Sequence, residues 1–195
     1  MKSIEIENEI VERNLTTNEK RNEKVPNTDS KGIVTIEGEY GTIKFERLLS
    51  HPKEIVWKAI TDPNEIFKWL PDYKGVIDEY KGGSLDLVNT VSGSHVTGDI
   101  LVWDLNRVFE YEWHIPPNPL FPHGEPESVI RWELKQDSDS DTHITMTHSH
   151  LTKRTSLFFG PGWHAYLDRL EASLNNQVPP DYNRRRAEVK ELYPS

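Results

Sequence analysis

The sequence predicts an α+β domain in which a curved antiparallel β-sheet wraps around a long carboxy-terminal α-helix, with two short helices after the first strand. Three observations lead to this prediction. Strand-like segments separated by short turns fill residues 73–151, and two short helical segments come before them. The last strong element is an amphipathic helical stretch, "GPGWHAYLDRLEASL". The strands have one apolar face and the helix one apolar stripe, so each must cover the other.

Length, charge and composition exclude several classes of protein. The 195 residues suit one domain with a hydrophobic core, and the six Trp, seven Tyr and six Phe make its apolar part rich in rings. A formal charge of -9 argues against nucleic acid or an anionic membrane surface as the main partner. The absence of cysteine from the sequence excludes disulfides, thiolate metal sites and a cysteine nucleophile. No signal peptide or membrane-spanning run is recognisable, so we expect a cytoplasmic protein without membrane insertion.

Composition divides the chain into three parts. Residues 1–30 are almost entirely polar and are expected to form a flexible extension, with a short amphipathic helix around Ile4 to Val11 as an option. Residues 31–176 are the predicted domain, which opens with a strand pair or an edge strand. Residues 177–195 form a tail in which Ala187, Val189 and Leu192 suggest a short helix.

The two short helices are predicted from their first residues. Pro52 suits the first turn of one helix. Asp62 suits the N-cap of the other, with Pro63 at its first position and Glu65 completing a capping box. The apolar sides are expected to comprise Ile55, Val56, Ala59 and Ile60 on the first helix and Phe67, Trp69 and Leu70 on the second.

Six strands are predicted near residues 73–80, 84–91, 94–104, 107–115, 128–136 and 142–151, as an antiparallel meander. Alternation is clearest in three of them, where one face carries Phe109, Tyr111 and Trp113, then Ile130, Trp132 and Leu134, then Ile144, Met146, His148 and His150. Glu112 and His114 fall on the opposite, polar face. In the following helix, Gly160 and Gly162 are expected to permit a tight start, with Pro161 in the first turn.

The ordered segments resemble a known superfamily. "FERLLSHPKEIVWKAITDPNEIFKWLP", "GGSL", "GDILVWDLNRVFEYEW", "SVIRWELK", "ITMTHSHL" and "GWHAYLDRLEASL" are together similar to the START-like helix-grip (SRPBCC) superfamily. Within it, the chain most resembles the family named after the activator of the heat-shock chaperone ATPase, over about residues 40–176. The resemblance implies a cavity between helix and sheet that holds lipids, polyketides or other flat apolar molecules, and says less about chemistry.

Rings and a few polar groups that face this interior are the candidate ligand contacts. Each also has a simpler interpretation as helix-to-sheet packing, because an aromatic residue on a buried stripe needs no other explanation. A pocket lined mostly by apolar groups with a few polar anchors is nevertheless typical of small-molecule sites. The candidate ligand-binding residues are Trp69, Tyr111, Trp113, Trp132, Met146, His148, Trp163, Tyr166, Leu167 and Leu170.

Histidines and carboxylates offer little support for a metal site or for catalysis. His148 could be a core histidine, a polar anchor or a proton donor. His148 and His150 on one face could share a metal, but no third ligand has suitable spacing, so no metal site is predicted. No nucleophile motif or phosphate-binding loop is present, and no cofactor or catalytic residue is assigned. Acid–base chemistry through Glu112, His114 or His148 remains an alternative.

Three functions are carried forward. The leading one is a cytoplasmic binding protein for a small apolar or aromatic molecule such as a lipid, polyketide or flavonoid. The alternatives are a co-chaperone-like interaction module, which the expected bacterial-type lone domain disfavours, and an enzyme or resistance protein for a polyketide-like substrate. The proline-rich residues 115–127 are expected to form either a semi-rigid flap carrying Leu120 and Phe121 or a plain solvent loop. A homodimer through this loop or the tails is a further option.

Overall fold

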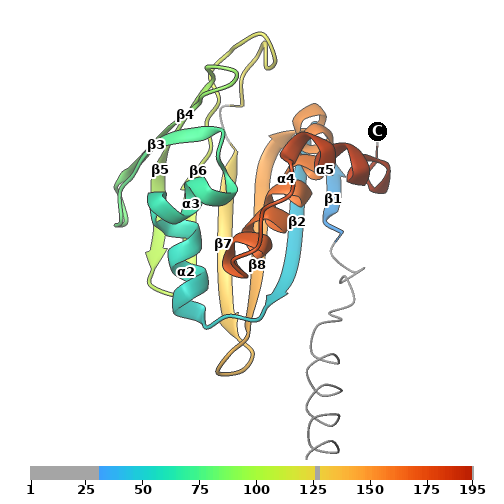
Figure 1. Cartoon of the computed structure of the whole chain (residues 1–195). Helices are drawn as coiled ribbons and strands as arrows, with labels where there is room; N and C mark the ends of the chain where they lie inside the picture. The colour runs from blue at the N-terminus through green and yellow to red at the C-terminus, as the bar shows by residue number, and fades with distance from the viewer. Residues whose placement is uncertain (1–30, 126–127, 195) are drawn as a thin grey trace, which may run out of the picture.

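A computed structural model describes residues 31–125 and 128–194 of the chain (Figure 1). Its elements are β1 (Ile33–Glu37), β2 (Tyr40–Leu49), α2 (Lys53–Thr61), α3 (Pro63–Trp69), β3 (Tyr73–Ile77), β4 (Ser84–Asn89), β5 (His95–Asp104), β6 (Val108–Glu112), β7 (Val129–Gln136), β8 (Thr142–Thr152), α4 (Lys153–Leu174), α5 (Tyr182–Val189) and the 3-10 turn η1 (Lys190–Leu192). The extension predicted for residues 1–30 lies outside the described residues, as does its helix near Ile4 to Val11.

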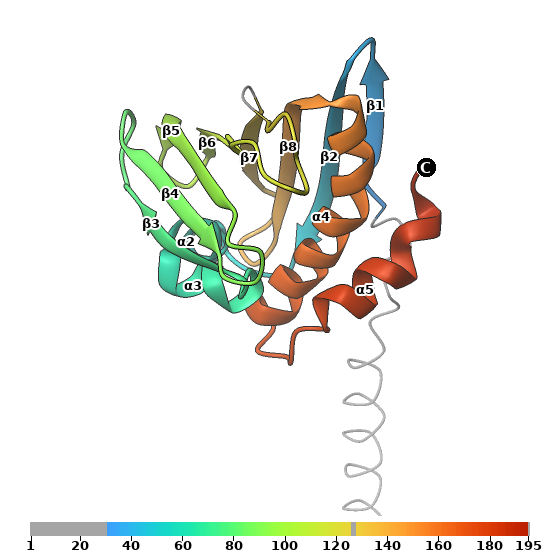
Figure 2. The same cartoon turned by 90° about the horizontal axis from the view of Figure 1, so that it is seen from above.

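The strands form one antiparallel sheet in the order β1-β2-β8-β7-β6-β5-β4-β3. Strands β3 to β8 follow one another as the predicted meander, and the hairpin β1–β2 joins it by pairing β2 with β8. Figure 2 shows the sheet curving around α4, with β3 to β5 on one side of the helix and β1 and β2 on the other. The predicted α+β helix-grip architecture is therefore confirmed.

The alternation in β6, β7 and β8 places their apolar residues on the concave face. Trp132 pairs with Phe109 on one side and Met146 on the other, and all three side chains are buried. The same alternation fails at the end of β8. His150 has a φ of +56° and is exposed, whereas His148 is fully buried. The prediction that these two histidines share a face is wrong, because a backbone irregularity separates them.

The caps of the short helices are largely as expected. Asp62 Oδ1 accepts a hydrogen bond from the Asn64 amide at 2.8 Å, with Pro63 in the first turn of α3. Glu65 does not complete the capping box, since its carboxylate instead pairs with Lys68 Nζ at 2.6 Å.

In α2, the buried face of the helix is shifted by about one residue from the predicted one. Ile55 is 49% exposed, and Trp57 is buried in its place, with its ring 5.2 Å from that of Trp103. The bulk of the Trp57 ring on the sheet decides the orientation of this short helix.

Helix α4 begins seven residues earlier than predicted. Its N-cap is Thr152, whose side chain accepts from the Thr155 amide at 3.3 Å, and Pro161 lies inside the helix. Gly160 and Gly162 therefore do not open the helix. A Cβ atom at Gly160 would lie 3.0 Å from the Tyr193 ring, and one at Gly162 would lie 3.0 Å from the Tyr182 hydroxyl. Both glycines let the carboxy-terminal segment lie close to α4.

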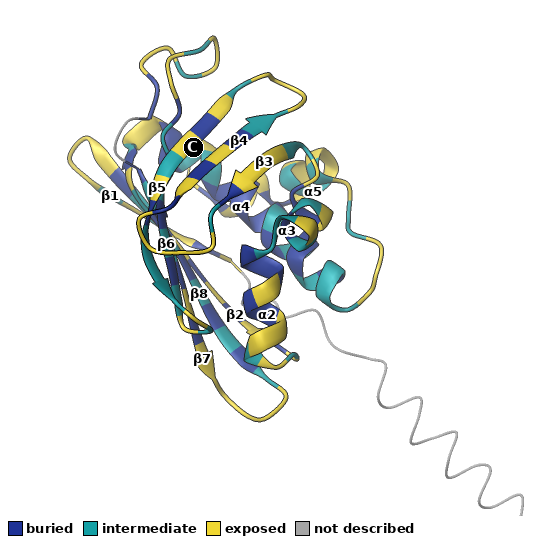
Figure 3. Cartoon of the chain, turned by 90° about the vertical axis from the view of Figure 1, so that its left-hand side faces the viewer, coloured by how far each residue is buried: buried dark blue, intermediate teal, exposed yellow. Residues whose placement is uncertain are grey.

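The hydrophobic core lies between the concave face of the sheet and the helices α2, α3 and α4 (Figure 3). Much of α4 is buried, because the sheet covers one of its sides and α5 covers another. No helix within residues 31–125 and 128–194 combines the length and apolar character needed to cross a bilayer.

Candidate functional site

A pocket of about 300 Å³ lies between α4 and the end of the sheet formed by β3 to β5. Its walls come from six segments: the end of α3 with the start of β3, the β4–β5 hairpin, the residues after β6, the proline-rich loop, the first half of α4, and the start of α5. The volume is at the lower end of the range typical of pockets for drug-sized molecules. This is the candidate ligand site.

Aromatic rings make up much of the pocket lining. Trp113 is one of them, with its ring centroid 5.8 Å from that of Tyr73 and 6.5 Å from that of Trp163. On the α4 side, the ring of Phe159 packs against that of Phe121 in the proline-rich loop, with the ring centroids 5.7 Å apart. Aromatic rings packed at these centroid distances give a rigid apolar surface that suits a flat ligand.

Three tyrosine hydroxyl groups and the Asp72 carboxylate supply polarity. Burial is the main cause that raises the pKa of Tyr73 to about 12, and it also raises the pKa of Tyr166 and Tyr182. The pKa of Tyr166 rises further because Tyr182, Tyr73 and Asp72 are near enough to repel its phenolate. All three phenols therefore stay protonated near neutral pH. Tyr166 is hydrogen-bonded to Tyr182 and Tyr73 to Asn89, which makes this part of the lining a polar network.

The proline-rich loop is attached to the start of α4 by a buried glutamate. Glu125 is 2% exposed and accepts hydrogen bonds from the Thr152 amide at 2.9 Å, the Thr152 hydroxyl at 2.6 Å and the Thr155 hydroxyl. A carboxylate at the N-terminus of a helix is favoured by the helix dipole. This anchor holds Leu120 and Phe121 among the residues that line the pocket.

The structure divides the candidate residues from the sequence into three groups. Trp113, Trp163 and Tyr166 line the pocket. Trp69, Tyr111 and Trp132 instead border, with Trp113 and Trp163, a void of about 10 Å³ in the core. The remaining candidates are buried away from both spaces, and they are Met146, His148, Leu167 and Leu170.

His148 supports the pocket wall from behind. Its Nδ1 accepts a hydrogen bond from Trp163 Nε1 at 3.0 Å, so the ring proton is on Nε2, which has no hydrogen-bond partner within the described residues. Burial lowers the pKa of His148 to about 3, so the ring is neutral near pH 7. A buried neutral imidazole of this kind orients Trp163.

The other chemical candidates lie elsewhere. Glu112 Oε2 and His114 Nε2 are 3.8 Å apart on the outer face of the sheet, both partly exposed, and neither lines the pocket. Among the residues that the structure describes, no three His, Asp or Glu side chains gather as a metal site would require.

Sequence reasoning missed most of the pocket lining outside the central strands and α4. Phe158 and Phe159 could have been found from the helical spacing before Trp163, had the N-cap at Thr152 been recognised. Tyr182 lies in the tail and has no local signal. The lining residues not foreseen as ligand contacts also include Leu70, Asp72, Tyr73, Asn89, Val91, Ser92, Ser94, Val96, Ile115 and Asn183.

A helix gripped by a curved antiparallel sheet, with an aromatic pocket between them, defines the START-like helix-grip class. The family described as "Activator of Hsp90 ATPase homolog 1-like protein" matches residues 50–175, and the chain belongs to this family. A search of curated proteins gives no match.

Solved structures agree with this assignment. The crystal structure of MLL2253 from Mesorhizobium loti is 25% identical, with a TM-score of 0.60 over 69% of this chain and 97% of that one. CalU16 from Micromonospora echinospora is also 25% identical, with a TM-score of 0.61 over 84% and 92%. EF2215 from Enterococcus faecalis, of unknown function, has a TM-score of 0.63 at 15% identity over 83% and 90%, which shows the fold alone.

Proposed function

We propose that this protein binds a small, flat, largely apolar molecule with an oxygen-bearing edge, in the pocket beside α4. The observation that carries the proposal is the pocket itself, about 300 Å³ with rings on several sides and protonated tyrosines at one side. Ligand pockets commonly combine an apolar lining with a few placed polar groups. A flavonoid or an aromatic polyketide has this shape and polarity.

A long acyl chain fits the lining less well. The polar groups at the pocket, Tyr73, Tyr166 and Tyr182 with Asp72 and Asn89, come from four segments and flank one side of it. A lipid tail would place only hydrocarbon against these polar groups, whereas an oxygen-bearing ring compound can contact them. We therefore favour the ring compounds over lipids.

The test is a binding panel with a blocked variant. Wild-type protein is examined by thermal shift and native mass spectrometry with a flavonoid such as naringenin, an anthraquinone such as emodin, and palmitate. A ring compound at about one hundred times its Kd should form a 1:1 complex and raise Tm by roughly 5–10 °C. Well-folded protein that binds no member of the panel would overturn the proposal.

A matched pair of variants locates the binding. Ser94 lies just before β5 and lines the pocket, so Ser94→Phe fills it, whereas Thr97 of β5 is exposed and does not line it. We expect Ser94→Phe to lose the complex and Thr97→Phe to keep it. Equal binding by both would place the ligand elsewhere.

The two alternatives from the sequence stay predictions. A chaperone interaction is tested by adding the protein to an Hsp90 ATPase assay, and turnover is tested by mass spectrometry of the panel compounds after incubation. Glu112→Ala is the variant that a role in turnover would affect.

A further inference from the structure

The side of α4 turned away from the sheet is covered by the tail segment, which we define as residues 177–193. Its close approach is possible at Gly160 and Gly162, where a Cβ atom would lie 3.0 Å from Tyr193 and from Tyr182 respectively. Val189 and Tyr193 are buried, at 2% and 7% exposure. The segment therefore lies directly on the helix.

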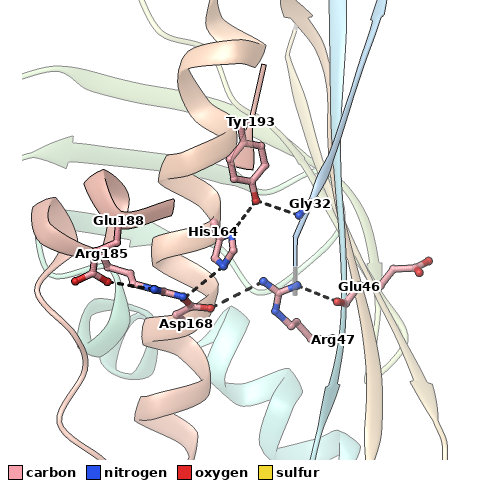
Figure 4. Close-up of polar contacts among 8 residues, drawn as sticks. All are labelled: Gly32, Glu46, Arg47, His164, Asp168, Arg185, Glu188 and Tyr193. Atoms are coloured by element: carbon pink, nitrogen blue, oxygen red, sulfur yellow. Dashed lines mark hydrogen bonds and ion pairs between the residues drawn. The ribbon is translucent and has the colours of Figure 1, made fainter. Parts of the chain in front are cut away.

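A charged network holds the tail segment in place (Figure 4). Asp168 of α4 accepts from Arg185 Nε of α5 at 2.7 Å, and Arg47 Nη2 of β2 lies 3.9 Å from the other carboxylate oxygen. Arg47 is buried at 4% exposure, so it depends on Asp168 as the nearest opposite charge. The carboxylate thus connects the sheet, α4 and the tail segment.

Two further attachments lie on either side of this ion pair. The Tyr193 hydroxyl accepts from the Gly32 amide at 3.0 Å and is 2.8 Å from His164 Nδ1, to which it can donate. At the other end, Arg169 donates to the Pro180 carbonyl and, through Nε, to the Trp69 carbonyl at 2.9 Å. The tail segment is therefore attached at its start, middle and end.

The attached segment contributes to the pocket. The Tyr182 ring stacks on Tyr166 with centroids 4.3 Å apart and an interplanar angle of 21°. Tyr182 and Asn183 both line the pocket. The family match ends at residue 175, so this wall lies outside the matched region.

We propose that the tail segment forms a fixed wall of the ligand pocket. In this wall, the Tyr182 ring contacts the ligand and favours ligands with a flat ring, and the Asp168–Arg185 ion pair keeps Tyr182 in position. This inference rests on the proposed function and adds that the tail segment determines which ligands the pocket prefers. Aromatic pairs gain from ring contact beyond simple area burial, so a second stacked ring strengthens the preference for a flat ligand. Arg185 acts only through Tyr182 and is a positioning residue.

The experiment uses the full chain and the fluorescent probe N-phenyl-1-naphthylamine, which carries a flat naphthalene ring joined to a phenyl ring through an amine nitrogen. Tyr182→Ala removes the ring, Tyr182→Phe keeps it, and Arg185→Gln breaks the ion pair. Arg184→Gln is the matched control, because that side chain is 71% exposed and makes a surface pair with Glu188. Circular dichroism and Tm verify that each variant folds.

We expect Tyr182→Ala and Arg185→Gln to weaken probe binding by about three- to tenfold, the range of one aromatic contact. Arg184→Gln should stay within about twofold of wild type, well below a tenfold step. Tyr182→Phe, which keeps the ring and loses only the hydroxyl, should weaken binding less than Tyr182→Ala. Trypsin provides a ligand-free readout, since Arg185→Gln should speed cleavage after Arg186, a site that the Arg184→Gln control keeps.

Other outcomes separate the two proposals. If wild-type protein binds the probe and Tyr182→Ala binds it equally well, the inference that the tail segment forms a wall of the site is wrong and the proposed function stands. An equal loss of binding in all four variants would also overturn the wall, since a general structural effect would explain it. If wild-type protein binds neither the probe nor any panel compound, both proposals fail together.

Discussion

The closed aromatic core beneath α2 and the pocket beside α4 contain the same kinds of side chain but differ in whether the space between them is filled. In the closed core, Trp57, Trp103 and Phe109 contact one another at 5.2 to 6.4 Å, and the void nearby is only about 10 Å³. The pocket, although also lined by rings, leaves about 300 Å³. A high content of rings therefore does not determine whether a site is hollow.

The difference comes from how the walls are held. In the closed core, rings on α2 and on neighbouring strands contact each other directly. Around the pocket, two walls are fixed from behind by polar attachments, the proline-rich loop through Glu125 and the tail segment through Arg185. Walls attached in this way need not collapse onto the opposite side, because their position does not depend on contacts across the space.

The largest effect is expected from truncation in the closed core. Trp132 is 1% exposed, and its ring lies 6.3 Å from Trp69. Trp132→Ala should lower the free energy of unfolding by about 3–5 kcal/mol, measured by urea denaturation. Phe158→Ala, at a pocket residue that is 48% exposed, should cost less than about 1 kcal/mol. Equal costs would show that the two regions do not differ in packing.

A second effect tests the attachment of the tail segment. Asp168→Asn leaves the Arg47 guanidinium buried without its counter-charge, so we expect a loss of about 3 kcal/mol in the free energy of unfolding. Glu188→Gln, whose side chain is 51% exposed, is the control and should change stability by less than about 0.5 kcal/mol. A loss no greater than that of the control would show that the network contributes little.

The third prediction concerns acid sensitivity. In the unfolded chain, histidines take up a proton as the pH falls through 6.5, whereas burial lowers the pKa of His148 to about 3 and of His164 to about 4 in the folded protein. The neutral rings contribute their full stabilisation above pH 6.5, and this contribution is lost as the pH falls toward the folded-state pKa values. From pH 7 to pH 5 each histidine should cost about 2 kcal/mol, measured as the shift in urea midpoint.

The matched variant for this prediction is His148→Gln, whose amide oxygen can still accept from Trp163. It should lose about half of the pH dependence between pH 7 and pH 5. The same slope in wild type and variant would mean that His148 does not titrate on unfolding in this window.

The smallest effect on stability is expected at Gly162. Alanine gains up to about 1 kcal/mol in a helix over glycine, but its Cβ would press on the Tyr182 hydroxyl at 3.0 Å. Gly162→Ala should therefore leave Tm nearly unchanged while altering probe binding through Tyr182. Unchanged binding would show that the pocket tolerates movement of this ring.

Local signals in the sequence were sufficient for the fold. Asp62 and Pro63 place the start of α3 correctly, because a cap depends on residues next to each other. The alternation of apolar and polar residues in β6, β7 and β8 correctly identifies individual residues of the concave face, such as Phe109, Trp132 and Met146. Errors arose where tertiary contacts override the local pattern, as at Ile55, or where one residue leaves it, as at His150.

The pocket was only partly predictable for the same reason. Trp113, Trp163 and Tyr166 lie on strongly patterned segments, and sequence reasoning found them as ligand candidates. Tyr182 is sixteen residues further along the chain than Tyr166 but stacks on it, and Tyr73 joins them in the pocket lining from β3. Long-range pairings such as these have no periodic signal in the chain.

The sequence by itself determined that a curved sheet with a ring-lined face would pack against the helix containing Trp163, since both have one apolar side to bury. Only the tertiary structure decided how far that helix stands from β3 to β5, and so whether a space remains. The physical reason is that this separation depends on attachments between distant residues, Glu125 to Thr152 and Asp168 to Arg185. Neither pair is marked by any local pattern.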